Sequence, residues 1–108
     1  MILPDLNLLL YAYNPHVPQY QKAAAWWSGV MNGVELVGFP YEICLGFVRI
    51  ATNNRLGAAT VPLSKARAVV AGWLELPQAR VLIPAPNHFE QVMNLMAAAM
   101  GSGALVSD

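Results

Sequence analysis

The sequence is poor in charge. Only 11% of its 108 residues are Asp, Glu, Lys or Arg, and six bases against six acids leave no formal net charge. Globular domains carry about 25% charged residues, so this composition excludes a disordered chain or a long solvated arm. A neutral chain also lacks the electrostatic footprint of a nucleic-acid-binding domain. If nucleic acid is the substrate, we expect groups other than Lys and Arg to hold its phosphates.

Cysteine and long apolar runs are scarce as well. The single cysteine, Cys44, forms no internal disulfide, which favours the cytoplasm. No apolar run reaches the roughly 20 residues that span a bilayer, and the N-terminus lacks the basic start of a secretory signal, so we expect no membrane association. Apolar residues nevertheless make up 56% of the chain. A domain of this size cannot bury them all, so we expect a homodimer or a bound partner.

Short apolar runs alternate with longer helical patterns. The runs at 2–3, 36–37, 81–83 and 104–106 predict strands, and helices are predicted at 6–13, 18–31, 40–51, 64–76 and 88–100. This alternation is typical of a parallel sheet with helices on both faces. The sequence therefore predicts one α/β domain over residues 1–108, with about four short strands.

Local signals refine this prediction. Gly38 is expected to end the second strand, Ser64 to cap the fourth helix, and residues 55–62 to form a loop. The three tryptophans, in such apolar helices, are interpreted as core or interface anchors rather than as platforms for bases.

Acidic residues stand next to several predicted strands. Asp5 follows the first strand, Asp108 follows the last, and Glu42 lies in the first turn of the helix after the second. Because the carboxyl ends of parallel strands meet at one edge, these three carboxylates are expected to converge there. Local roles are open as well: Asp5 could cap the following helix, and Glu42 could complement a helix dipole.

Converging carboxylates require a cation, since like charges confined together repel. Carboxylate oxygens with water suit Mg²⁺ or Mn²⁺, and such an ion can bridge to a phosphate and activate water against a phosphodiester. A metal site would also explain how a neutral protein holds an RNA backbone.

Several segments together resemble PIN-domain ribonucleases of the VapC toxin type. The resemblance is carried by the opening Met-Ile-Leu-Pro-Asp-Leu-Asn-Leu-Leu-Leu-Tyr-Ala, the Trp26-Trp27 pair, residues 38–53 and the final Gly-Ala-Leu-Val-Ser-Asp. Each motif is short, but their order and spacing extend over essentially the whole chain.

The resemblance implies a PIN-like fold and a Mg²⁺- or Mn²⁺-dependent endoribonuclease. Such a toxin cuts single-stranded or loop RNA, blocks translation and is neutralised by a cognate antitoxin. Asp5 matches the family's first acid and Asn7 the polar residue that supports it. Asp108 matches the acid that opens the helix after the fourth strand.

The chain departs from the family pattern at two points. Many members carry the second acid just before a Phe-X-Arg element, where this chain has Gly46; Glu42 lies one helical turn earlier on the same face and is expected to reach the same site. The family also continues beyond the position of Asp108, so we expect the domain to be incomplete at its C-terminus.

A second function class stays open at this stage. The apolar composition is equally typical of a non-catalytic PIN-like interaction module that binds a partner helix or a second copy of itself. The two classes differ in the state of the acid cluster, because only the nuclease needs Asp5, Glu42 and Asp108 as metal ligands.

Overall fold

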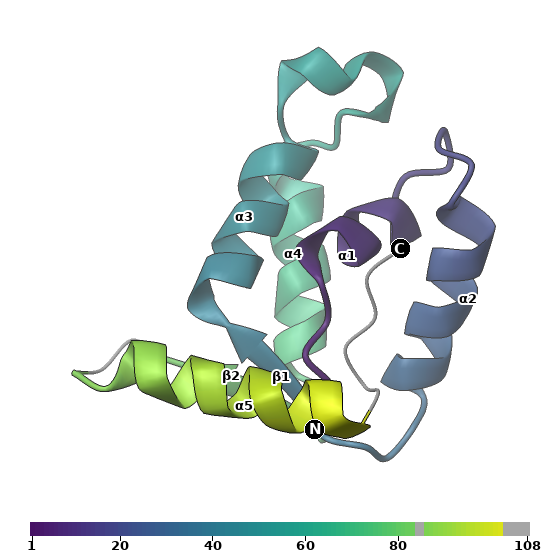
Figure 1. Ribbon diagram of the computed structural model, residues 1–108. Coiled ribbons are helices and arrows are strands. Elements are labelled where there is room, and N and C mark those ends of the chain that lie inside the picture. Colours follow the sequence, from purple (N-terminus) through teal and green to yellow (C-terminus); the bar gives the residue numbers. More distant parts are fainter. Residues whose placement is uncertain (84–85, 103–108) are drawn as a thin grey trace.

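The computed structural model describes residues 1–83 and 86–102, and it confirms the α/β class (Figure 1). The elements in chain order are α1 (Leu6–Ala12), α2 (Tyr20–Met31), β1 (Val37–Pro40), α3 (Tyr41–Ala51), the 3-10 helix η1 (Asn54–Ala59), α4 (Leu63–Leu74), β2 (Ala79–Leu82) and α5 (His88–Ser102). Within these residues no helix is both long and apolar enough to cross a membrane.

The strands form a short parallel sheet. β1 pairs with β2 in a register that sets Val37 opposite Ala79, and on the other side of β1 residue Ile2 makes a single parallel bridge to Val37. The amide of Ile2 donates to the carbonyl of Leu36 at 2.7 Å. The predicted first strand is therefore one bridge long, because Pro4 has no N–H with which to continue the ladder. The predicted strand at 104–106 lies outside the described residues.

Gly38 lies inside β1, so the prediction that it ends this strand is wrong. A Cβ atom at this position would stand 2.7 Å from Cδ2 of Leu3 and 2.9 Å from Sδ of Met1. The N-terminal segment thus packs directly on the backbone of β1, and a glycine is what allows this approach. This contact holds the N-terminal segment, which carries Met1 and Leu3, beside β1.

We expect Gly38→Ala to lower the free energy of unfolding by about 1 kcal/mol, because the added methyl group overpacks a buried contact. Gly72→Ala in α4 is the matched control. Its Cβ would meet nothing within 4 Å, so relief of the glycine entropy cost should stabilise the helix by about 0.5–1 kcal/mol. Urea denaturation measures both values, and equal effects of the same sign would contradict the packing argument.

The helices pack against one another and lie on both sides of the strands (Figure 1). α1 packs against both α2 and α3, and α3 packs against α4; Figure 1 shows α5 in front of the strands and α4 behind them. Ser64 lies in the first turn of α4 and is not its cap, since Pro62 occupies that position. The predicted loop after α3 contains η1, where Gly57 takes a φ of 58°.

An aromatic cluster fills the core between these helices and β1. Trp27 and Trp73 are each 1% exposed, and the Phe39 ring of β1 stacks on Trp73 at 5.6 Å with an interplanar angle of 9°. The hydroxyl of Tyr13 accepts a hydrogen bond from Nε1 of Trp27 at 3.1 Å and one from Nε1 of Trp73 at 2.8 Å. The predicted core role of these two tryptophans is confirmed.

Candidate functional site

Asp5 stands where the N-terminal segment leaves the sheet. Its backbone is extended, with φ −71° and ψ 139°, and its carbonyl accepts the amide of Leu9 at 3.1 Å, so it occupies the N-cap position of α1. Its side chain, however, makes no capping hydrogen bond. The alternative that the Asp5 carboxylate serves as a helix cap is therefore wrong, and the residue is half-buried.

Glu42 stands at the corresponding place after the second strand. β1 ends at Pro40, whose fixed φ of −59° suits the start of α3, and Glu42 follows in the first turn of that helix. Its side chain is exposed. Because the Ile2 bridge aligns the N-terminal segment with β1 in parallel, both acids leave the sheet at the same edge.

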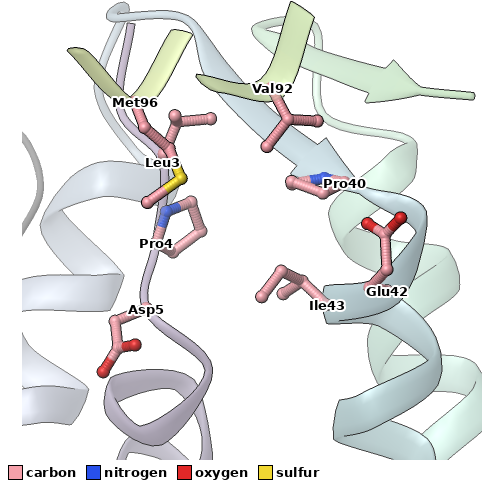
Figure 2. A pocket seen from close by; sticks show the side chains of 8 residues that line it. All are labelled: Leu3, Pro4, Asp5, Pro40, Glu42, Ile43, Val92 and Met96. Atoms are coloured by element: carbon pink, nitrogen blue, oxygen red, sulfur yellow. The ribbon is translucent and has the colours of Figure 1, made fainter. Parts of the chain in front are cut away.

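A cavity of about 240 Å³ lies between these two segments. It is lined by Leu3, Pro4, Asp5, Pro40, Glu42, Ile43, Val92 and Met96. Figure 2 shows Asp5 and Glu42 on opposite walls with Ile43 between them, and their carboxyl groups do not point toward one another. The structure thus brings two of the three predicted acids to one cavity.

The other predicted site residues are placed less closely. Asn7 is exposed in the first turn of α1, two residues beyond Asp5. Asp108 lies outside the described residues, and within residues 1–83 and 86–102 no group of three His, Cys, Asp or Glu side chains is arranged to hold a metal ion. Of the three predicted acids, the structure therefore places Asp5 and Glu42 at this edge of the sheet.

Gly46, at the position where the family often has an acid, is buried against α1. A Cβ atom there would lie 2.9 Å from Cδ2 of Leu6, so a longer side chain would have to displace Leu6. The same glycine lets α3 approach α1 closely, and Glu42, one turn earlier, reaches the cavity wall instead. The second acid that lines this cavity thus lies in the first turn of α3.

Two lining residues were not predicted from the sequence. Val92 and Met96 come from α5 and line the cavity at the end away from Asp5 (Figure 2). Their spacing of four residues puts them on one face of a helix, which was the only available signal. These apolar walls lower the local dielectric, which strengthens the interaction of the acids with any cation bound between them.

The lone cysteine does not belong to this site. Cys44 is half-buried in α3, and desolvation by burial raises the pKa of its thiol, an effect that a hydrogen bond involving its own backbone partly offsets. A raised pKa disfavours the thiolate, so Cys44 is poorly suited to act as a nucleophile or as a metal ligand.

Several known proteins that are similar to this chain are named as VapC ribonucleases. Ribonuclease VapC33 of Mycobacterium tuberculosis is 42% identical over 96 residues, which cover 89% of this chain and 67% of the relative. Ribonuclease VapC37 of the same species is 35% identical over 109 residues, covering the whole chain and 75% of the relative. Ribonuclease VapC31 is 28% identical over 108 residues, again with the whole chain covered and 76% of the relative. No protein-family model matches the chain.

Proposed function

The chain belongs to the VapC ribonuclease family, and on this premise we propose that it is an endoribonuclease toxin that cuts RNA at the cavity between Asp5 and Glu42. The observation that carries the proposal is the shared cavity, with one acid on each wall and the Asp5 carboxylate not used as a helix cap. Single-stranded or loop RNA is the proposed substrate.

The donors at this edge fit a hard divalent cation, Mg²⁺ or Mn²⁺. Mg²⁺ is commonly held by only one or two carboxylates, keeps several of its waters and completes its shell with substrate phosphate. Asp5 and Glu42 are the acids of the cavity lining that would hold the ion. When bound, it supplies positive charge at the scissile phosphate and lowers the pKa of water.

The chain's own residues fix this arrangement. The Asp5 carbonyl is tied into the first turn of α1 and Pro4 precedes it, so the backbone that carries the carboxylate is rigid. Leu3, Ile43 and Met96 restrict water at the cavity wall. The residues therefore position two acids beside apolar walls, with Asp5 half-buried and Glu42 exposed.

Neutralisation by a cognate antitoxin is the second part of the proposal. Large apolar side chains remain on the surface, among them Leu63, Ile83 and Phe89, which are 63%, 70% and 78% exposed. Such surface is typical of a protein that spends part of its time covered, by a partner helix or by a second copy in a homodimer. The same observation supports the alternative of a non-catalytic interaction module.

We expect the purified 108-residue chain to cleave mixed single-stranded RNA when Mn²⁺ or Mg²⁺ is present and to stop when EDTA removes the ion. Gel electrophoresis of end-labelled RNA measures the cleavage, and restoring excess Mn²⁺ after EDTA should restore it. A folded chain that cuts equally well in EDTA contradicts metal dependence. A folded chain that never cuts contradicts the nuclease assignment of this polypeptide and favours the interaction module.

A further inference from the structure

The formal neutrality of the chain hides a strong separation of charge. Residues 43–74 contain four bases and no acid, whereas the rest of the chain contains two bases and all six acids. The four bases are Arg49, Arg55, Lys65 and Arg67, and every one of them is exposed. This stretch therefore carries a formal charge of +4 within a neutral protein.

The segments that carry these four residues lie together because the chain doubles back at η1. The amide of Val61 donates to the carbonyl of Ala51 at 2.8 Å, and the hydroxyl of Thr60 donates to the carbonyl of Asn53 at 3.0 Å. The end of α3, η1 and the start of α4 thus form one end of the molecule, which we call the basic end. Figure 1 shows it remote from the strands and α5.

Nothing in the described part of the chain neutralises the basic end. The ion pair that joins the N-terminal amine to Glu35 at 3.9 Å involves none of the four bases, and no acid in residues 1–83 and 86–102 is seen paired with them. Arg80 differs from the four, since its guanidinium donates to the carbonyls of Pro77 and Ala79 at 3.1 and 2.8 Å. The charges of the basic end are therefore available to an external anion.

The basic end is connected to the acidic cavity along one face of α3. Glu42 and Arg49 are seven residues apart and both exposed, and seven residues complete almost two whole helical turns, so the two side chains lie on the same face about 10 Å apart along the axis. Leu45, between them on this face, is 52% exposed. An extended ligand bound at the cavity can thus continue along this face of α3 to Arg49.

We propose that the basic end is the phosphate-binding surface for single-stranded RNA whose scissile bond lies at the Asp5 and Glu42 cavity, with Arg49, Arg55, Lys65 and Arg67 holding the backbone. This proposal rests on the proposed ribonuclease function. It revises the expectation, drawn from net charge alone, that groups other than Lys and Arg hold the phosphates.

An RNA backbone fits this surface better than an acidic protein segment does. The bases are spread over three successive elements rather than collected in one pocket, which matches a ligand with a charge on every repeating unit. The α3 face also leads directly to the proposed site of cleavage. An acidic segment of a partner protein is the competing occupant, and the experiment separates the two.

The test measures binding of a fluorescently labelled, mixed-sequence single-stranded RNA in EDTA, so that no divalent-dependent cleavage occurs, between about 50 and 200 mM NaCl. For single strands the slope of log K against log salt falls in magnitude by about 0.7 for each phosphate that the protein no longer neutralises. We expect this decrease for each of Arg49→Gln, Arg55→Gln, Lys65→Gln and Arg67→Gln, and about three units of slope for the combined variant.

Lys22→Gln is the matched control, since it removes the same charge from exposed α2, outside the basic end. It should leave the slope of the unaltered chain unchanged. Circular dichroism checks that each variant is folded, and the single variants keep the test decisive if the combined variant is not. An unchanged slope in folded variants overturns the proposal, as does tight binding of polyglutamate with no binding of RNA.

Failure of this proposal can be told from failure of the ribonuclease function. If the unaltered chain cleaves RNA with Mn²⁺ but the basic-end variants keep the full slope, the nuclease stands and the proposed surface is wrong. If the slopes fall as expected while the unaltered chain never cleaves, the surface binds RNA and the catalytic proposal is wrong.

Discussion

Asp5→Asn is expected to reduce divalent-dependent RNA cleavage by about a thousandfold while leaving the chain folded. The substitution keeps the shape of the side chain but removes the charge that would hold the ion on one wall of the cavity. Losing about 4 kcal/mol of transition-state stabilisation corresponds to that factor. Initial rates of cleavage under Mn²⁺ measure the effect.

The fold should tolerate this change because the Asp5 side chain makes no capping hydrogen bond. Asn is also an accepted N-cap residue, so stability should remain within about 0.5 kcal/mol. Glu75→Gln is the control, since it removes an acid that is exposed at the end of α4, outside the cavity lining. Cleavage by Asp5→Asn at the rate of this control would show that the cavity is not the catalytic site.

Tyr13→Phe is expected to lower the free energy of unfolding by about 3 kcal/mol. The change removes one oxygen atom, yet that oxygen is the acceptor for the indole N–H groups of both Trp27 and Trp73. Each donor left unsatisfied in the core costs about 1–3 kcal/mol. A domain of this size has about 5–15 kcal/mol of stability in total, so the loss should be large in a urea titration.

Tyr41→Phe provides the matched comparison, because Tyr41 is 49% exposed. Loss of that hydroxyl should change the free energy of unfolding by less than about 0.5 kcal/mol. If Tyr13→Phe is equally mild, the shared hydroxyl does not satisfy both indoles. A double-mutant cycle with Trp73→Phe would then measure the coupling between the two side chains directly.

The sequence was sufficient to predict the class of fold and the approach of Asp5 and Glu42 to one cavity. Short apolar runs separated by helices require a covered parallel sheet, and the rule that carboxyl ends share an edge puts Asp5 and Glu42 near one another. The cavity that both line agrees with this reasoning. The role of Asp108 stays a prediction, since this residue lies outside the described part of the chain.

Other features depend on tertiary contacts that local patterns do not encode. From the sequence alone Gly38 is predicted to end a strand. Only the contact with the N-terminal segment explains why a glycine lies inside β1. Val92 and Met96 have helical spacing, but no sequence signal states which surface α5 covers. The Asp5 backbone adopts an N-cap conformation while its carboxylate makes no cap bond, a distinction that residue type cannot reveal.

The basic end gives this formally neutral protein a positive pole, because residues 43–74 contain four bases and no acid. Acids elsewhere in the chain balance its charge, so the total of zero conceals a separation of charge. In the field of a polyanion such a molecule experiences a torque before contact, which turns the positive pole toward the ligand. Low salt should therefore speed association chiefly by improving orientation, an effect that a measurement of net charge or isoelectric point would never reveal.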